Sequence, residues 1–222
     1  MEEKKKFILA IPTIVIIVVV IIGIFMIFYK RNVKDMSRED VRILAQKVAT
    51  INNISCEIVS ESNDISKEKS VTDYKLKDRK LACKTDYYTI FDDENENTKI
   101  QIDENEKVAY VYKEYKSEIM SFQEMLCTAE KLLESNEYEY KFLKYETMNG
   151  IKCVSFSLFN SDSTFDIWLD KSTGMIVKME CHYHMEGVQK IDTAMYYRYQ
   201  IGVVLDDDVK KPDLTDYSII DL

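Results

Sequence analysis

The feature that most constrains this chain is an uncharged apolar run of 23 residues near its start, residues 7–29. As a helix rising 1.5 Å per residue, the run is about 34 Å long, and the hydrocarbon core of a bilayer is about 30 Å thick. A helix packed on a soluble domain would show a polar face, and this run has none. It therefore predicts a transmembrane helix over residues 7–29.

A cleaved signal peptide is the alternative reading of this run. The apolar core of a signal peptide is usually about 7–15 residues long and is followed by small residues. Here the core is longer, ends in Tyr29-Lys30-Arg31 and is followed by no Ala-x-Ala site. We therefore expect an anchor that is retained.

The charges beside the run do not decide its orientation, because Lys and Arg flank both ends. A tail of six residues is too short for a functional extracytoplasmic domain, so we expect the tail inside and the folded body outside. The predicted organisation is a cytoplasmic tail over 1–6, a transmembrane helix over 7–29, a juxtamembrane linker over 30–36 and an extracytoplasmic domain over 37–222. The expected location is the cell membrane, crossed once.

The formal net charge of the chain is −9, and its basic residues are interspersed with Asp and Glu. A nucleic-acid-binding surface needs a basic patch or stripe that neutralises phosphates. The charge pattern therefore argues against nucleic acid as a partner.

Two segments have the spacing of amphipathic helices. The first, residues 37–53, begins with Ser37 and Asp40 as a capping box, and the second, residues 121–137, begins with Ser121 and Glu124 as another. The apolar residues of the second segment recur at i, i+3, i+4 and i+7, the pattern of a helix that lies on a sheet. They are Phe122, Met125, Leu126, Ala129, Leu132 and Leu133.

In most of the remaining chain, apolar and polar residues alternate with a period of two between short polar turns. This pattern is typical of an antiparallel sheet. Asn149-Gly150 predicts a hairpin, and the acidic connections 92–97 and 104–106 predict solvated loops. Strands are predicted over residues 54–58, 71–77, 80–85, 87–91, 98–103, 108–115, 140–147, 151–159, 164–169, 175–185 and 193–204. Residues 206–217 predict a loop, since Pro212 cannot continue a ladder.

The hairpin around Asp170 carries a short motif, formed by Ile167, Trp168, Leu169, Asp170, Thr173, Gly174 and Lys178. With its N-terminal helix, its run of strands and its inserted helix, the chain resembles, over residues 37–215, the LolA-like superfamily of outer-membrane lipoprotein carriers and sorting proteins and their membrane-anchored Gram-positive-type relatives.

This resemblance implies an α+β, mostly β fold. The implied architecture is an N-terminal transmembrane helix followed by a strongly curved antiparallel sheet, an open half barrel, with a helix packed on its concave face. In that superfamily the apolar space between sheet and helices accepts acyl chains or other hydrophobic ligands. The retained anchor departs from carriers that diffuse between two membranes.

The only two histidines form a His-x-His pair, His182 and His184. Residues two apart on a strand project from one face. The pair therefore shares the charged face with Lys178 and Glu180, while Cys181 and the apolar residues beside it project from the other face. A metal site needs three or four converging ligands, and no other His or Cys-x-x-Cys is present. We expect exposed strand residues and no metal.

The five cysteines are Cys56, Cys83, Cys127, Cys153 and Cys181. An odd number leaves at least one without an internal partner, and buried apolar Cys is the default reading. Cys127 lies opposite the apolar stripe of its helix, so we expect it to be the most exposed thiol. The chain has no Gly-x-Ser-x-Gly, phosphate loop or His-Glu-x-x-His motif, and we expect no enzyme.

The sequence favours a non-enzymatic, membrane-anchored surface protein that binds a lipid, a lipoprotein acyl chain or another hydrophobic ligand. The alternative is an envelope module for protein–protein interaction or sensing, with a filled core and no small ligand. No cofactor is expected, and the expected partners are the membrane, a lipid or lipoprotein, and an envelope protein. The predicted apolar lining consists of Met125, Leu126, Met175, Val177, Met179 and Tyr183.

Overall fold

The structure is a computed structural model that describes residues 35–62, 69–113, 115–183 and 191–222. Residues 37–222 form one compact unit. The predicted cytoplasmic tail, the predicted span and most of the predicted linker lie outside the described residues. Their boundaries and the extracytoplasmic location stay predictions.

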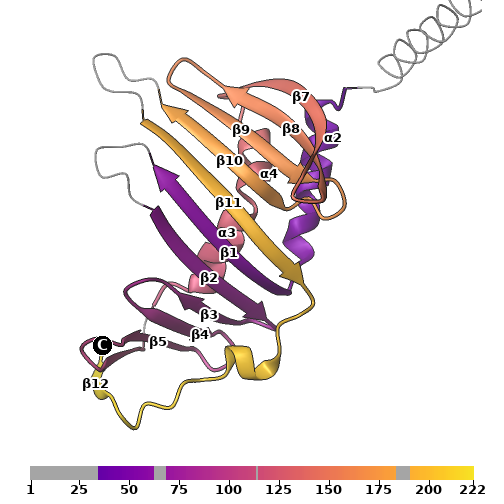
Figure 1. Cartoon of the computed structure of the whole chain (residues 1–222). Helices are drawn as coiled ribbons and strands as arrows, with labels where there is room; N and C mark the ends of the chain where they lie inside the picture. The colour runs from indigo at the N-terminus through magenta and orange to yellow at the C-terminus, as the bar shows by residue number, and fades with distance from the viewer. Residues whose placement is uncertain (1–34, 63–68, 114, 184–190) are drawn as a thin grey trace, which may run out of the picture. The chain divides into compact units, whose positions relative to one another are not determined.

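Within the described ranges, twelve strands form one open sheet in the order β12-β6-β5-β4-β3-β2-β1-β11-β10-β9-β8-β7 (Figure 1). The strands are β1 (Asn53–Ser62), β2 (Lys69–Lys77), β3 (Lys80–Lys84), β4 (Thr89–Asp93), β5 (Thr98–Asp103), β6 (Val108–Tyr112), β7 (Glu139–Met148), β8 (Ile151–Phe159), β9 (Ser163–Asp170), β10 (Ile176–Tyr183), β11 (Ile191–Ile201) and β12 (Ser218–Asp221). The helices are α2 (Arg38–Ala45), η1 (Gln46–Thr50), α3 (Glu118–Leu126), α4 (Thr128–Glu134) and η2 (Asp206–Val209), of which η1 and η2 are 3₁₀ turns.

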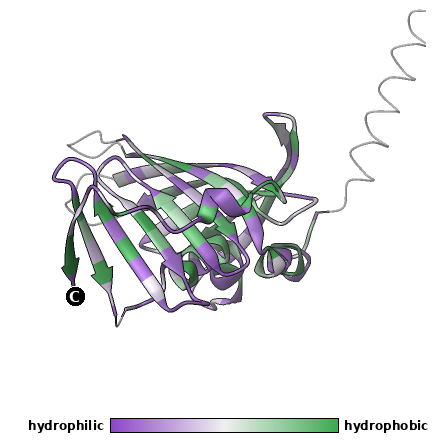
Figure 2. Cartoon of the chain, turned by 90° about the horizontal axis from the view of Figure 1, so that it is seen from below, coloured by the Kyte–Doolittle hydropathy of each residue, from purple (hydrophilic) through white to green (hydrophobic). Residues whose placement is uncertain are grey.

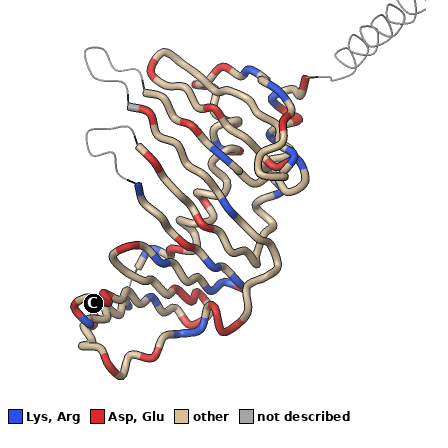
Figure 3. Tube along the Cα trace, in the orientation of Figure 1, with Lys and Arg blue, Asp and Glu red and all other residues tan. Residues whose placement is uncertain are grey.

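The sheet has one apolar face, as the alternation in the sequence predicts. Along β10 the side chains of Val177, Met179 and Cys181 are buried, while those of Lys178 and His182 are only partly buried. Figure 2 shows hydrophobic and hydrophilic residues alternating along several strands. Because successive side chains on a strand point to opposite faces, the two faces have separate compositions. Figure 3 shows acidic and basic residues interspersed along the described part of the chain, which carries no basic stripe.

The helices α2 and α3 contact the sheet at β7 and β3, and α4 packs against both of these helices. In α3, the ring of Phe122 stacks on Tyr74 of β2 with 4.5 Å between centroids. In α2, the predicted capping box is present: the Ser37 hydroxyl accepts the backbone N–H of Asp40, whose carboxylate accepts the N–H of Ser37. The guanidinium of Arg38 donates to carbonyl groups at the end of α4, among them that of Leu133 at 2.8 Å. These contacts hold the helices as one layer.

The fold expected from the sequence is wrong in two respects. The sheet is not wholly antiparallel, because β12 runs parallel to β6 while every other neighbouring pair in the described ranges is antiparallel. The parallel strand follows from the C-terminal segment, in which Leu214 and Tyr217 pack against the buried Phe91, Ile100, Ile102 and Ala109 of β4–β6. In addition, the helical layer holds three helices rather than one. They are α2 and the two helices α3 and α4, which separate at Cys127, where ψ is 7°.

The transmembrane part of the expected fold finds no support in the structure. No helix within residues 35–62, 69–113, 115–183 and 191–222 is long and apolar enough to cross a membrane. The apolar run 7–29, on which that expectation rested, lies outside the described residues.

The helix predicted over 121–137 begins earlier than its local signal indicates. It starts at Glu118, and the expected cap Ser121 lies inside α3, where its hydroxyl donates to the carbonyl of Ser117. The first turn is capped instead by Asp92 of β4, whose Oδ2 accepts the backbone N–H of Glu118 at 2.7 Å and of Ile119 at 3.3 Å. A carboxylate brought in by the fold therefore replaces the local capping box.

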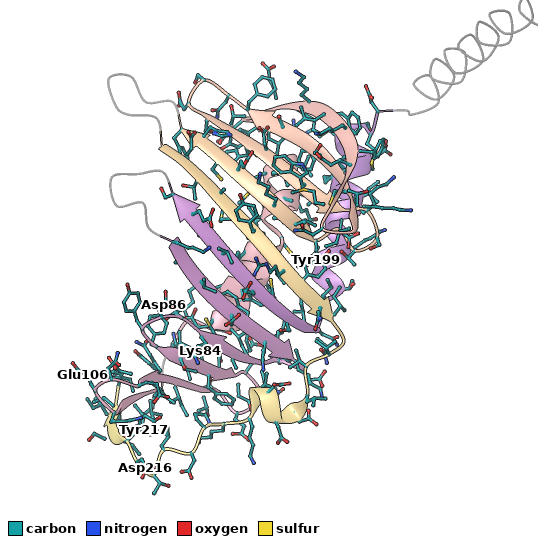
Figure 4. All side chains as sticks on the ribbon, viewed as in Figure 1. Lys84, Asp86, Glu106, Tyr199, Asp216 and Tyr217 are labelled. Atoms are coloured by element: carbon teal, nitrogen blue, oxygen red, sulfur yellow. The ribbon has the colours of Figure 1, made fainter. Side chains whose placement is uncertain are left out.

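The turn after β9 is organised by Asp170. Its Oδ1 accepts the backbone N–H of Ser172 at 2.7 Å, and its Oδ2 accepts the hydroxyl groups of Thr173 at 3.0 Å and Tyr199 at 2.6 Å. Tyr199, which comes from β11, is labelled in Figure 4. Burial disfavours the carboxylate, but the hydrogen bonds outweigh it and hold the pKa of Asp170 below its ordinary value. The predicted reversal at 170–174 is confirmed, with Gly174 at φ +76°.

Candidate functional site

An open apolar groove of about 250 Å³ lies between η1 and the two helices α3 and α4. Its buried floor includes Val48 and Leu126, and its rim includes Met120, which is 52% exposed. The groove is lined by Val48, Ala49, Ile51, Met120, Gln123, Glu124, Leu126, Cys127 and Lys131. An exposed, flexible Met beside buried aliphatic groups is suited to apolar partners of variable shape.

The backbone explains why this space stays open. The chain tightens from α2 into the 3₁₀ turn η1, and on the opposite wall the helix changes direction at Cys127. Ala49 and Cys127 are small, so neither side chain fills the gap between the two walls. The charged and polar groups of the lining belong to Gln123, Glu124 and Lys131. The Nζ atom of Lys131 is 3.8 Å from the carboxylate of Glu124. The groove is therefore apolar at its floor and polar at its margin.

Cys127 is the least buried of the five cysteines, as the sequence predicts, and all five are free thiols in the structure. Burial raises the pKa of the Cys127 thiol, and the nearby Glu130 acts in the same direction. The thiol is therefore protonated at neutral pH. No histidine is among the groove's lining residues, so the groove itself contains no thiol–imidazole pair for nucleophilic chemistry.

The structure distributes the predicted lining residues over different places. Leu126 lines the groove, and Met125 is partly buried on the same helix. On the strand side, Met175, Val177 and Met179 are at most 5% exposed and belong to the packed core. Tyr183 is exposed near the end of β10, where its ring meets Phe165 edge-on at 6.3 Å.

Of the nine residues that line the groove, only Leu126 was in the predicted lining, and the apolar residues that it missed include Val48, Ala49 and Met120. Met120 was absent from the predicted lining because the helix was predicted to begin one residue after it, at Ser121. Val48 lies in the first predicted helical segment, residues 37–53, but no local pattern shows that this segment lines a groove. The position of η1 against α3 depends on contacts between distant segments.

His182 lies on the face of the sheet opposite Cys181, as predicted, and its side chain is partly buried. Its Nδ1 is 2.6 Å from Oδ1 of Asp192 on β11. His184, the other member of the pair, lies outside the described residues. The prediction of an exposed histidine is therefore wrong for His182, which is partly buried in a polar cluster.

No family model matches the sequence, and no curated protein matches it either. Among solved structures, MucB aligns with a TM-score of 0.47 and 12% identity over 82% of this chain and 66% of MucB, just under two thirds of its length. A LolA superfamily protein from Nitrosomonas europaea aligns with a TM-score of 0.32 and 8% identity, over 77% of this chain and 97% of that one. A putative outer membrane lipoprotein-sorting protein domain from Vibrio parahaemolyticus aligns with a TM-score of 0.29 and 12% identity, over 78% and 97%.

A LolA superfamily protein and a lipoprotein-sorting domain are thus among the structures that this chain is similar to, in line with the resemblance stated from the sequence. They do not support a Gram-positive-type relative. All three TM-scores lie below 0.5, so the function proposed below rests on the groove alone.

Proposed function

We propose that this domain is a non-enzymatic binding module that holds one apolar chain, such as an acyl tail, in the groove between η1 and α3–α4. The observation that carries the proposal is the groove itself: buried aliphatic groups form its floor and Met120 stands exposed at its rim. Its volume, about 250 Å³, is slightly below the ~300–1,000 Å³ of ordinary ligand pockets. That size fits a single chain better than a bulky ring system.

The hydrophobic effect supplies the affinity in this proposal. Each methylene buried from water contributes about 0.8 kcal/mol, so a few methylenes against Val48 and Leu126 give measurable binding. A polar head group would remain at the margin, where Gln123, Glu124 and Lys131 lie. The domain would act by contact and would leave the ligand chemically unchanged.

The first test replaces Met120 with Glu in the full chain and measures binding of parinaric acid, a fatty acid whose fluorescence rises in apolar surroundings. We expect the Kd to rise at least tenfold, about 1.4 kcal/mol, because a carboxylate in the apolar wall must lose water without gaining a partner. The matched control is Ile219→Glu on β12, since Ile219 is 56% exposed and lies outside the groove. Equal affinity in the Met120→Glu variant and the unmodified chain would rule the groove out.

Cys127 provides an independent measurement at the same place. It lines the groove, whereas the other four cysteines are buried. Bound parinaric acid should slow alkylation of Cys127 by N-ethylmaleimide several-fold, and a Cys127→Ser variant should lose the rapidly labelled thiol. If a saturating probe leaves the labelling rate unchanged, the probe binds elsewhere.

The second candidate is a protein-interaction module of the envelope with no small ligand. It is favoured by the filled core, in which Met175, Val177 and Met179 are at most 5% exposed and leave the groove as a shallow surface feature. It predicts no parinaric acid binding by any variant. A photocrosslinker attached to Cys127 should instead join the chain in intact cells to one specific protein, and Met120→Glu should abolish that product.

A further inference from the structure

The outer face of the sheet, opposite the helices, holds a cluster of three side chains that the proposed function does not use. Asp166 comes from β9, and Glu180 and His182 come from β10. Glu180 is the register partner of Asp166, and His182 follows two residues later on the same face. One ligand atom from each of the three lies within 4.8 Å of the others. The sheet register therefore brings one imidazole and two carboxylates to a single point.

The histidine in this cluster has a fixed orientation. Its Nδ1 lies 2.6 Å from Oδ1 of Asp192, which is its register partner on β11. An ionised carboxylate can only accept, so the ring donates through Nδ1. Its Nε2 then faces Asp166, 4.0 Å from Oδ2. A carboxylate that fixes the ring through one nitrogen while the other faces further ligands is the usual support of a metal-binding histidine.

The two carboxylates are also held in place. The hydroxyl of Ser157 on β8 donates to Oδ1 of Asp166, and Nζ of Lys178 lies 2.6 Å from Oε1 of Glu180. Asp166, Glu180 and Asp192 outnumber the single ammonium group of Lys178, so the cluster attracts cations. None of its members is a thiol, because Cys181 projects to the opposite face.

Access to the cluster is provided by an adjoining hollow of about 270 Å³. It forms where Ala194 is the register partner of Glu180, since the small side chain leaves space on the sheet. The hollow is lined by Glu61, Ser62, Glu180, His182, Asp192, Thr193 and Ala194. Hydrated ions therefore have a path to His182 and Glu180 from solvent.

We propose that Asp166, Glu180 and Nε2 of His182 bind a divalent transition-metal cation of the zinc type. Because the three ligand atoms lie within 4.8 Å of one another, a central point is at most about 2.8 Å from each, whereas Zn–N and Zn–O bonds are about 2.0–2.2 Å. Each ligand atom therefore moves inward by at most roughly 0.7 Å, which small side-chain rotations provide. Imidazole favours zinc over magnesium or calcium, and water completes the coordination. The bound ion cross-links β9 and β10, and Asp192 of β11 is a positioning residue.

The competing arrangement is a protonated His182 that bridges Asp192 and Asp166 without a metal. The two arrangements differ in a direct measurement: zinc binds at Nε2 in the proposed site, and no zinc binds in the competing arrangement. The full chain is stripped of metal with a chelator and titrated with zinc chloride by calorimetry. We expect one zinc per chain, and with zinc at about 100 times its Kd a rise in Tm of roughly 5–10 °C.

Substitutions then locate the ion. His182→Ala and Asp166→Asn should abolish zinc binding, and Asp192→Asn should weaken it about 10–100-fold while leaving the three ligands in place. The matched control is Glu57→Gln, which removes a carboxylate paired with Arg198 at 2.6 Å on the same face. Glu57→Gln should bind zinc as the unmodified chain does.

Cobalt(II) reports the ligand types independently of stability. At this site it should show weak visible bands without the intense near-ultraviolet absorption of cobalt–thiolate bonds, since no cysteine takes part. The proposal is overturned if the unmodified chain binds no zinc, if His182→Ala binds it equally well, or if cobalt shows thiolate absorption that Cys127→Ser removes.

Discussion

Replacing Gly174 with Ala should destabilise the domain by about 3 kcal/mol or more. Gly174 has φ +76°, a conformation that costs an L-residue about 1–2 kcal/mol. A Cβ at this position would also overlap the carbonyl oxygen of Leu44 and lie 3.0 Å from its carbonyl carbon. Backbone atoms cannot rotate away, so α2 must shift, which adds about 1–3 kcal/mol. Urea denaturation of the full chain measures the loss as a lower midpoint with an unchanged slope.

The matched control is Gly150→Ala in the turn between β7 and β8. Gly150 has φ +83°, but nothing lies within 4 Å of an added Cβ. It should therefore cost only the conformational part, about 1–2 kcal/mol. If both substitutions cost the same, the close approach of α2 to the turn at Gly174 does not contribute to stability.

The second large effect is expected for Asp92→Ala, at about 3 kcal/mol. Asp92 is fully buried, and its carboxylate accepts hydrogen bonds from the hydroxyls of Tyr115 and Ser117 as well as from the first N–H groups of α3. Removing it leaves these donors without their partner, which costs about 1–3 kcal/mol for a buried group, in addition to the cap of α3. Since α3 carries Met120 and Leu126, parinaric acid binding should weaken as well.

Asp103→Ala is the control for this substitution. Asp103 is the last residue of β5 and accepts the backbone N–H groups of Asn105 at 2.9 Å and Glu106 at 3.0 Å, in bonds that are exposed to solvent. Its loss should cost no more than about 1 kcal/mol, because water replaces it. Urea midpoints of the two variants give the comparison, and equal midpoints would contradict the role assigned to the buried carboxylate.

The features that the sequence predicted well are those set by near neighbours. The capping box of Ser37 and Asp40, the hairpin at Asn149-Gly150 and the alternation of Val177, Met179 and Cys181 all depend on residues close in the chain. Propensity and periodicity report such local preferences directly. They therefore gave the main strands, the first helix and the reversal at Gly174.

Three of the wrong predictions involve contacts between residues that are far apart in the chain. The acidic segment 92–97 was expected to be solvated, but Asp92 and Asp93 are buried, Asp92 because it caps a helix more than 20 residues away. Ser121 has the local signature of an N-cap, but the distant carboxylate of Asp92 caps the helix instead. The strand β12 was missed because its position depends on Leu214 and Tyr217 reaching the β4–β6 core.

The sequence predicted an apolar binding site but identified only part of its lining residues. Leu126 was identified from the helical stripe, whereas Ala49 and Met120 require the arrangement of η1 against α3. The cation cluster shows the same limit. The sequence placed Glu180 and His182 on one face but could not supply Asp166 or Asp192, because strand register decides which residues are opposite them.

The order of strands in the sheet also determines when the chain can fold during synthesis. The strand β1 pairs with β11, so one edge of residues 53–62 stays without a neighbouring strand until residues 193–201 have been synthesised. At ~5–20 residues per second, a ribosome needs on the order of ten seconds to make the intervening chain. The strands β1 to β6 and the strands β7 to β10 can form two separate groups first. The strand β11 then joins the two groups, because it pairs with both β1 and β10. Until then β1 presents an open edge to other nascent chains, so the protein is exposed to aggregation during this interval.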